Sequence, residues 1–329
     1  SPYKESLIFS FDGGGNDGFF NVYHAKDNKI NLLEKVKSDF GGGYMLGASI
    51  LHEISDNSRH QLALPGKSMG LCAYGEPKEE LVSHFKEFFF DRDYKKLSEK
   101  TGLELLNVNK PWKNPMSNAK FSNQEAYDLA ATLQKAYEKA FEEVFVRWKD
   151  KFPGAGICFT GGGSLNVLLN EKIKDQFGIT AYIPPNPNDC GLSLGAAFIV
   201  SPPSGRPVVT YNGIPLLDKD KLPEHVAQRG ATKVTLADVA DLIKKGNIVG
   251  LVYGDSEVGP RALGNRSILA DPTNPNMKDI INKKRKKRES FRPFAPVTLK
   301  EFQNEWFESK FLSQYMSSLS IVKKDKQKI

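Results

Sequence analysis

Two apolar segments that run straight into glycine triplets constrain the fold of this chain more than any other feature. They are SLIFSFDGGG, residues 6–15, and GICFTGGG, residues 156–163. A short apolar run bounded by glycines predicts a buried strand that feeds a tight loop. Between them, residues 123–148 place apolar side chains on one helical face, which we interpret as core, and Ser122 with Glu125 predicts a capping box at the helix start. Strands that alternate with helices predict an α/β fold.

The chain has 329 residues, enough for about two domains of ~150 residues each. The joint is expected at SPPSGRP, residues 201–207, because its prolines and glycine interrupt helix and strand periodicity alike. Residues 1–200 would then form one domain and residues 208–329 another. In the second, Thr235 predicts the start of a helix, Gly246 its end, and residues 248–253 a strand.

Composition and charge narrow the class of protein. Hydrophobic residues make up 40% and charged residues 26% of the chain, and no apolar run approaches the ~20 residues of a membrane span. The three cysteines are odd in number and no secretory leader is visible, so we expect reduced thiols in a cytoplasmic protein without a membrane partner. The net charge of +7 resides in residues 271–329, with 14 basic and 7 acidic residues, whereas the preceding residues hold 32 of each. Because a nucleic-acid binder would spread its charge more widely, nucleic acid is not an expected partner.

Three glycine loops in the first half carry candidate ligand-binding residues. In FDGGGNDG, Asp12 and Asp17 flank glycines whose N–H groups can turn toward a phosphate, and a carboxylate there can hold Mg²⁺. The alternative for this loop taken alone is a tight hairpin turn. TGGGSLN leads from a strand into a helix whose N-terminus would face a ligand, and NDCGLSLGAA places Asp189 before a helix of small residues that permits close packing. Neither a Walker loop nor a dinucleotide fingerprint occurs, and the series resembles the actin, chaperone and sugar-kinase superfamily, which holds a nucleotide between two lobes.

Two basic loops in the second half are candidate anion sites. GDSEVGPRALGNRSILADP, residues 254–272, places two arginines on a backbone bent by glycines, at the carboxyl end of a predicted strand, where α/β sheets bind ligands. KKRKKRESFRPFAP, residues 283–296, adds three more cations in a stretch stiffened by prolines. Guanidinium forks match phosphate oxygens and would stabilise charge on a leaving pyrophosphate. We predict that five cations converge on one pocket: Arg261, Arg266, Lys286, Arg288 and Arg292. For Lys283, Lys284 and Lys287 the favoured alternative is a solvated helix face or a non-specific nucleic-acid patch.

Taken together, these motifs resemble one enzyme family. LPGKSMGLCAYG (residues 64–75), TGGGSLN, NDCGLSLGAA, SEVGPRALGNRSILADP and KKRESFRPFAP occur in the order found in the O-carbamoyltransferases of the nodulation and antibiotic-tailoring type. The resemblance covers nearly the whole chain. It implies the second lobe of an actin- or sugar-kinase-like (ASKHA) carbamoyl-transfer domain, followed by the first part of a YrdC-like α/β domain. The latter would form carbamoyl-adenylate from carbamoyl phosphate and ATP, and the former would move the carbamoyl group to an acceptor hydroxyl.

The resemblance also implies site residues, cofactors and substrates. Around carbamoyl phosphate and the nucleotide phosphates it places the five cations of the two basic loops. In the nucleotide site of the transfer domain it places Asp12, Gly14, Gly162, Gly163 and Asn166. Asp189 corresponds to a carboxylate ligand of a divalent, iron-type metal. The implied cofactors are therefore ATP, Mg²⁺ and that metal, and the implied partners are carbamoyl phosphate and a hydroxyl-bearing small molecule or sugar.

The chain departs from the family pattern in its histidines and at its ends. The family combines the metal carboxylate with two histidines at helical spacing, upstream of the first glycine loop, and no such pair occurs here; His52 and His60 are eight apart. We therefore expect the central part of an enzyme, with weak or no carbamoyl transfer by itself, and a second polypeptide as one source of the absent ligands. The alternatives are a sugar-kinase-like phosphotransferase, which leaves GPRALGNRSIL and ESFRPFAP without a role, and a non-catalytic nucleotide- or nucleic-acid-binding module.

Overall fold

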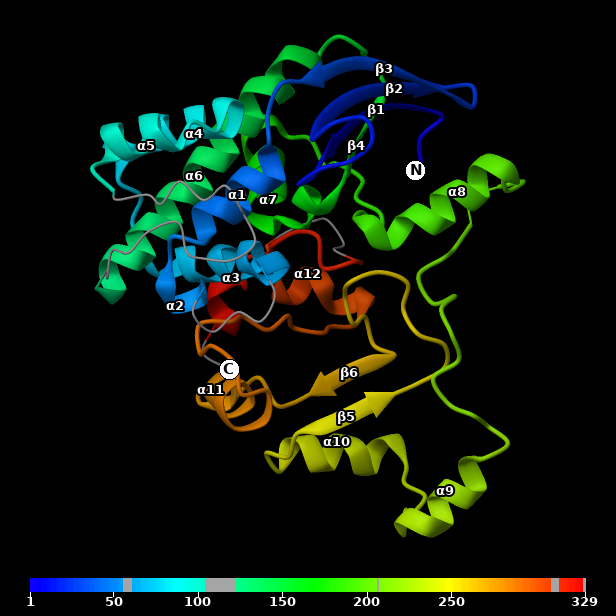
Figure 1. Cartoon of the computed structure of the whole chain (residues 1–329). Helices are drawn as coiled ribbons and strands as arrows, with labels where there is room; N and C mark the ends of the chain where they lie inside the picture. The colour runs from blue at the N-terminus through cyan, green and yellow to red at the C-terminus, as the bar shows by residue number, and fades with distance from the viewer. Residues whose placement is uncertain (56–60, 104–121, 206, 309–313, 328–329) are drawn as a thin grey trace. The chain divides into compact units, whose positions relative to one another are not determined.

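A computed structural model describes residues 1–55, 61–103, 122–205, 207–308 and 314–327 of the chain. The chain forms two compact units, unit 1 from Ser1 to Asp189 and unit 2 from Cys190 to Ile329. Each unit contains helices and strands, which confirms the predicted α/β class (Figure 1). No helix in the described ranges is long and apolar enough to cross a membrane. The expected joint at residues 201–207 stays a prediction, and Arg206 within it lies outside the described residues.

Unit 1 contains a four-stranded sheet that brings two glycine loops together. Its strands follow the order β3-β2-β1-β4 (Figure 1), with bounds β1 Glu5–Phe11, β2 Phe20–Lys26, β3 Lys29–Val36 and β4 Gly156–Thr160. Strand β2 pairs antiparallel with β1 and β3, whereas β1 and β4 are parallel. Both strands expected from the sequence, β1 and β4, are confirmed. Because parallel strands end at the same edge of a sheet, the loops that follow β1 and β4 are neighbours, with Ser10 opposite Thr160.

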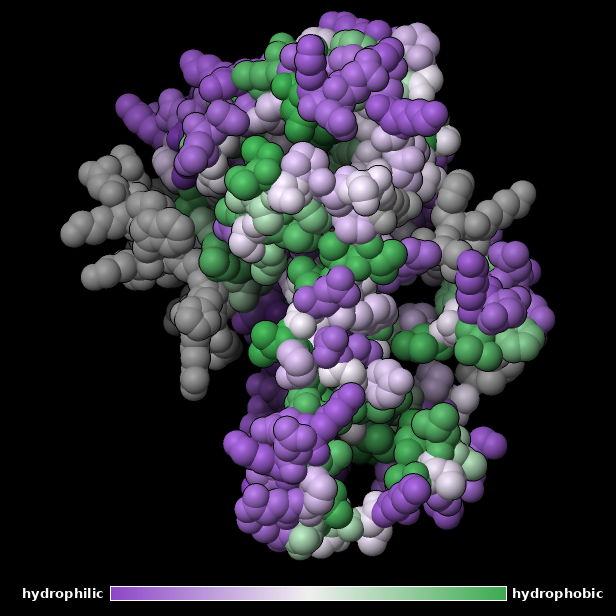
Figure 2. Space-filling view, turned by 90° about the vertical axis from the view of Figure 1, so that its right-hand side faces the viewer, coloured by the Kyte–Doolittle hydropathy of each residue, from purple (hydrophilic) through white to green (hydrophobic). Residues whose placement is uncertain are grey.

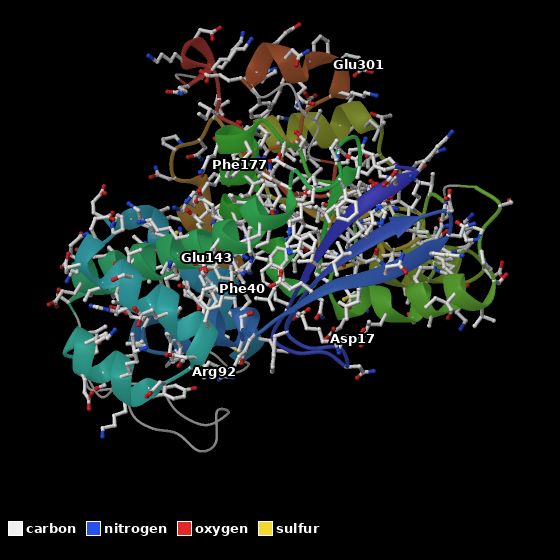
Figure 3. All side chains as sticks on the ribbon, turned by 90° about the horizontal axis from the view of Figure 1, so that it is seen from above. Asp17, Phe40, Arg92, Glu143, Phe177 and Glu301 are labelled. Atoms are coloured by element: carbon white, nitrogen blue, oxygen red, sulfur yellow. The ribbon has the colours of Figure 1, made fainter. Side chains whose placement is uncertain are left out.

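Helices surround an aromatic core in unit 1. They are α1 Phe40–Ala48, α2 His52–Ser55, α3 Leu64–Leu71, α4 Glu79–Asp91, α5 Tyr94–Thr101, α6 Asn123–Trp148 and α7 Val167–Phe177. The fully buried Phe40, labelled in Figure 3, lies with its ring centroid 6.2 Å from that of Phe11 and 6.3 Å from that of Phe141. Helix α6 has the predicted bounds, the predicted capping box and a buried apolar face. Aromatic packing between β1, α1 and α6 therefore supports the edge of the sheet where the glycine loops lie.

Unit 2 consists of short elements. Its helices are α8 Leu192–Val200, α9 Leu222–Arg229, α10 Leu236–Lys244, α11 Met277–Asp279 and α12 Gln303–Trp306, and its strands are β5 Val249–Val252 and β6 Arg266–Leu269. The predicted cap at Thr235 is confirmed as a capping box with Asp238. The basic loop follows the carboxyl end of β5, as expected. Because β5 and β6 pair antiparallel, this loop is a hairpin connection.

Much of the apolar surface of unit 2 is exposed. No residue of α8 is buried, although its small side chains had suggested close packing, and Leu236 of α10 is 87% exposed. The face drawn in Figure 2 shows hydrophobic side chains as separate patches between hydrophilic ones. Two buried polar side chains, Glu257 and Asn282, organise the loops of this unit.

Candidate functional site

Asp12 joins the two glycine loops at the end of the sheet. It directly follows β1, and its Oδ1 accepts a hydrogen bond from the N–H of Gly13 at 2.6 Å. Its Oδ2 accepts from the N–H of Gly162 at 2.5 Å. One carboxylate thus bridges the loop after β1 and the loop after β4. Because each carboxylate oxygen has a second lone pair, the same group can also face a cation or a water molecule.

A third glycine triplet, Gly41–Gly43 in the first turn of α1, lies against the same carboxylate-bearing residue. The N–H of Gly41 donates to the carbonyl oxygen of Asp12 at 3.0 Å. A Cβ atom on Gly41 would lie 2.4 Å from the nitrogen of Gly13, so this close approach of two backbones requires glycine. Sequence reasoning missed this triplet, although DFGGG repeats the acid-and-glycine signal of DGGG and would have revealed it.

Asp39 anchors the third triplet. Its side chain caps α1 by accepting the N–H of Gly42 at 2.9 Å and forms an ion pair with Arg92, which is labelled in Figure 3 at the end of α4. Burial raises the pKa of Asp39, and the Arg92 charge and the N–H groups of Gly42 and Gly43 oppose that rise. The ion pair therefore ties the start of α1 to the end of α4.

The other residues predicted to bind a nucleotide lie at the same edge of the sheet, and one of them, Asn166, already forms hydrogen bonds within the protein. Gly162 and Gly163 open a 3₁₀ turn after β4, and the Tyr137 hydroxyl donates to the carbonyl of Gly163 at 3.4 Å. Gly14 lies in the loop after β1 with a φ of 152°. Asn166 is buried and caps α7, so its carboxamide stabilises the start of this helix.

Gly161 provides a test of how tightly this edge is built. Its φ is 86°, and a Cβ atom there would lie 2.3 Å from the carbonyl oxygen of Phe11. Gly154 has nearly the same φ, 85°, with nothing within 4 Å of its Cβ position. We expect Gly154→Ala to cost about 1 kcal/mol in unfolding free energy through left-handed backbone strain alone, and Gly161→Ala about 3 kcal/mol because the backbones must also separate. Urea denaturation measures both, and equal losses would contradict the close approach.

Asp189, the predicted metal ligand, lies exposed in a 3₁₀ turn at the end of unit 1. Within the described ranges, no group of three His, Cys, Asp or Glu side chains could hold a metal ion. His52 opens α2, whereas His60 lies outside the described residues. The described side chains therefore do not fit the iron-type metal. The three cysteines form no disulfide, as predicted.

In unit 2, Glu257 organises the first basic loop. Its Oε1 accepts the N–H groups of Leu263 at 2.8 Å, Asn265 at 2.8 Å and Arg266 at 3.1 Å, and its Oε2 accepts Nε of Arg266 at 2.9 Å. Burial acts to raise the pKa of Glu257, but the Arg266 guanidinium and the backbone donors outweigh it and bring the pKa to about 2. The glutamate is thus the buried anion around which the hairpin loop turns.

Arg261, on the same loop, has unused hydrogen-bonding capacity. Its Nε is buried without a hydrogen-bond partner among the residues that the structure describes. Burial lowers the pKa of its guanidinium. A buried donor that lacks a partner costs about 1–3 kcal/mol, which an anionic ligand would recover.

Asn282 organises the second basic loop. It is fully buried, and its Nδ2 donates to the carbonyl oxygens of Ser290 at 3.2 Å and Arg292 at 2.9 Å. Its Oδ1 accepts Nε of Arg288 at 2.7 Å. The Arg288 guanidinium also lies over the ring of Phe294, 4.9 Å from the centroid, and Phe294 is 40% exposed. One amide and one ring thus fix the direction of Arg288.

The second basic loop gathers three of the five predicted cations. Burial lowers the pKa of Lys286, and the charges of Arg288 and Arg292 lower it further. Burial and Arg292 likewise lower the pKa of Arg288. Lys283, interpreted as solvated, is exposed and paired with Asp279 at 2.8 Å. The effects of Arg288 and Arg292 on the pKa of Lys286 indicate that the three cations lie near one another. Their convergence with the two arginines of the hairpin loop stays a prediction.

Comparison with known proteins identifies the class. The family model described as Carbamoyltransferase N-terminus matches residues 1–198, and the one described as Carbamoyltransferase C-terminus matches residues 240–329. The chain therefore belongs to the carbamoyltransferase family.

Curated relatives agree with this assignment. The nodulation protein NolO of Bradyrhizobium diazoefficiens is 31% identical over 94% of this chain and 57% of its own length. The nodulation protein NolNO of Sinorhizobium fredii is 32% identical over 94% of this chain and 46% of its own length. An uncharacterized protein of Methanocaldococcus jannaschii is 30% identical over 99% of this chain and 57% of its own length. The chain spans about half the length of these relatives.

Proposed function

We propose that this chain carries the nucleotide- and carbamoyl-handling parts of an ATP-dependent O-carbamoyltransferase. Unit 2, as part of a YrdC-like domain, forms carbamoyl-adenylate from carbamoyl phosphate, ATP and one water molecule. Water releases inorganic phosphate from carbamoyl phosphate, and the carbamate oxygen then displaces pyrophosphate from the α-phosphorus of ATP. Unit 1, as an ASKHA-like lobe, transfers the carbamoyl group from the adenylate to the hydroxyl of a sugar or other small molecule and releases AMP. Family membership supports the carbamoyl chemistry, and the two sites described above support its division between the units.

The observation that carries the proposal is the cluster of Lys286, Arg288 and Arg292. Each of the first two has its pKa lowered by burial and by a like-charged neighbour. Within the described ranges the cluster forms one ion pair, between Arg292 and Glu289 at 3.5 Å. Three cations facing one carboxylate leave an excess of positive charge that a phosphate or pyrophosphate group would neutralise.

In unit 1, the residues present fit a nucleotide with Mg²⁺ better than they fit the iron-type metal. Asp12 and the three glycine triplets bring one carboxylate and backbone without side chains to a single edge of the sheet, a combination that can hold phosphates and Mg²⁺. Asp12 would hold Mg²⁺ or an ordered water, and the glycines would allow a phosphate to approach the backbone. Mg²⁺ bound there would neutralise negative charge on the phosphates.

ATP–pyrophosphate exchange tests the proposal. We expect the chain to exchange labelled pyrophosphate into ATP only when carbamoyl phosphate is present, because adenylate formation is reversible and needs no acceptor. Exchange is expected even where transfer to an acceptor is weak. Production of ADP with a sugar, without exchange, would instead identify a sugar-kinase-like phosphotransferase. Binding of RNA or DNA with a steep salt dependence, again without exchange, would identify a nucleic-acid-binding module.

A further inference from the structure

We propose that Gln134 is a positioning residue that holds the glycine loops of unit 1 in place for a nucleotide. The inference rests on the nucleotide site proposed for these loops. Gln134 lies on the buried side of α6 with 4% of its surface exposed, among apolar side chains that form the core. A buried polar group survives in such surroundings only when its hydrogen bonds are made, so its partners indicate what it holds.

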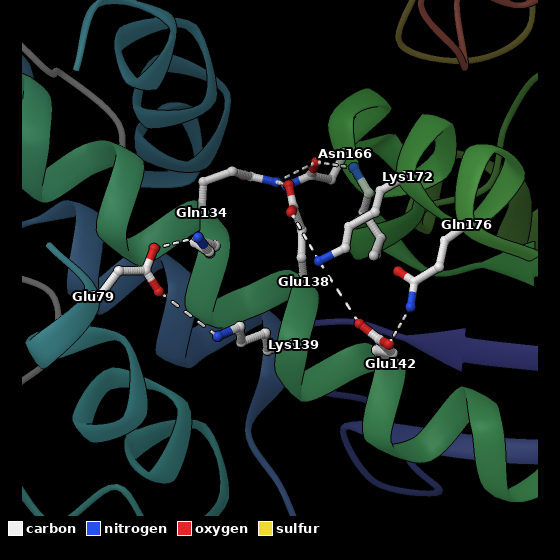
Figure 4. Close-up of polar contacts among 10 residues, drawn as sticks. Glu79, Gln134, Glu138, Lys139, Glu142, Asn166, Lys172 and Gln176 are labelled. Atoms are coloured by element: carbon white, nitrogen blue, oxygen red, sulfur yellow. Dashed lines mark hydrogen bonds and ion pairs between the residues drawn. The ribbon is translucent and has the colours of Figure 1, made fainter. Parts of the chain in front are cut away.

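The carboxamide of Gln134 uses its full hydrogen-bonding capacity, and Figure 4 shows its contacts with Asn166 and Glu138. Its Oε1 accepts from the Tyr44 hydroxyl at 2.7 Å and from Nδ2 of Asn166 at 2.9 Å. Its Nε2 donates to Oδ1 of Asn166 at 3.1 Å and to Oε1 of Glu138 at 2.8 Å. A glutamine amide has two acceptor lone pairs and two donor hydrogens, and all four are occupied by three side chains.

These partners connect two of the three glycine triplets of unit 1, Gly41–Gly43 and Gly161–Gly163. Tyr44 lies on α1 directly after the triplet Gly41–Gly43, and burial raises its pKa far above the ordinary value, so its hydroxyl stays a donor. Asn166 ends the loop that begins at Gly161 and caps α7 by accepting the N–H of Leu169 at 3.0 Å. Gln134 therefore fixes the start of α1 and the start of α7 to α6.

Removal of the amide would leave the Tyr44 hydroxyl and the Asn166 amide without their partner in a buried place. Both groups would then turn toward water or toward each other, and the two loops would lose their common attachment. Gln134 does not belong to the glycine cradle, so it acts on a nucleotide only through the loops. Its loss should weaken nucleotide binding while the strands of the sheet stay intact.

Gln124 offers a matched control on the same helix. Its Nε2 donates to Oδ1 of Asp128, four residues further along α6, at 2.8 Å, just as Nε2 of Gln134 donates to Glu138. Gln124 is exposed, however, and belongs to the first turn of the helix. Gln124→Leu therefore reports the loss of an equivalent amide-to-acid contact without any link to the glycine loops.

The experiment compares Gln134→Leu with Gln124→Leu in the whole chain by amide hydrogen exchange and by calorimetric titration with Mg·ATP. We expect Gln134→Leu to accelerate exchange about tenfold or more in residues 161–169 and 41–46, with β1 and β4 unchanged, and to raise the Mg·ATP dissociation constant about tenfold. Gln124→Leu should change neither. Gln134→Glu should also weaken the loops, because it sets two carboxylates side by side and turns an acceptor toward Oδ1 of Asn166. Adding Glu138→Gln removes the first of these conflicts and should restore the loops in part.

The outcomes separate this inference from the function on which it rests. If the parent chain does not bind Mg·ATP, the nucleotide site fails, and loop exchange alone then decides whether Gln134 holds the loops. If the parent binds Mg·ATP, and Gln134→Leu shows the same amide exchange rates and the same Mg·ATP dissociation constant as the parent, the positioning role is wrong. Faster exchange across β1 and β4 as well would show a general loss of packing and would equally overturn it. Partial restoration by the double variant is the result that a simple packing role does not produce.

Discussion

Replacing Glu257 with glutamine is expected to destabilise the hairpin loop of unit 2 by about 3 kcal/mol, because charged hydrogen bonds contribute roughly 1.5–3 kcal/mol each. The carboxylate accepts from three backbone N–H groups and from Nε of Arg266. A glutamine retains one acceptor oxygen, but its NH₂ group would face the Arg266 donor. The side chain of Glu257 is 0% exposed, so no water can replace the lost acceptor.

The same substitution should remove a pH dependence of the unfolding free energy. The pKa of Glu257 is lowered from its ordinary 4.5 to about 2, so the folded state favours the ionised form. The stabilisation is therefore fully present above about pH 4.5 and is lost as the pH falls toward 2. The difference in unfolding free energy between the parent chain and Glu257→Gln should accordingly narrow over that interval and stay constant above it.

Amide hydrogen exchange of peptides from β5 and β6, measured over a urea series, reports the stability of this loop locally. Glu301 supplies the control, because it is an exposed glutamate of the same unit, labelled in Figure 3. Glu301→Gln should leave exchange in residues 249–269 unchanged at every pH. If both variants behave alike, the loop does not depend on a buried anion, and the positions of Arg261 and Arg266 need another explanation.

Unit 1 was largely predictable from local patterns. An apolar run that ends in glycines could only be a buried strand, and the apolar face of residues 123–148 with its capping box defined α6 to the residue. Parallel pairing of β1 with β4 then placed two glycine loops at one edge. The third triplet, Gly41–Gly43, carried the same signal and was missed because no obvious strand precedes it; its contact with Asp12 joins residues distant in sequence.

The buried polar partners were not predictable in the same way. Gln134 and Asn166 are 32 positions apart, and no periodicity indicates that their amides pair. The family resemblance placed Asn166 in the nucleotide site, and the same position is also where a helix needs its N-cap. Glu257 stood within a recognised motif, yet only the folded hairpin shows that it is buried and holds Arg266. Sequence patterns report exposure and local turns, whereas these contacts depend on tertiary structure.

Removing Arg288 is expected to weaken the binding of pyrophosphate, a stable probe of the proposed anion site, by about 10–100-fold, the equivalent of ~1.5–3 kcal/mol for a charged hydrogen bond. Asn282 and the ring of Phe294 hold this guanidinium in one orientation, so little further ordering is needed when an anion binds. Arg288→Lys should bind pyrophosphate about tenfold more weakly than the parent chain. An ammonium group keeps the charge, but it does not stack on the ring in the same way and does not offer two parallel N–H donors. Isothermal titration calorimetry measures each constant.

Lys283→Ala is the matched control, since it removes the same charge from the same segment at an exposed residue already paired with Asp279. A diffuse basic surface would respond equally to both alanine variants, and its affinity would fall steeply with salt. In a built site, pyrophosphate affinity would fall in Arg288→Ala and hardly change in Lys283→Ala, because Asn282 and the ring of Phe294 fix the direction of Arg288. Loss of Arg288 also removes a repulsive neighbour, so the pKa of Lys286 should rise. A Lys286 pKa that stays unchanged in Arg288→Ala would show that the two cations do not face a common space, and the proposed anion site would then lack its physical basis.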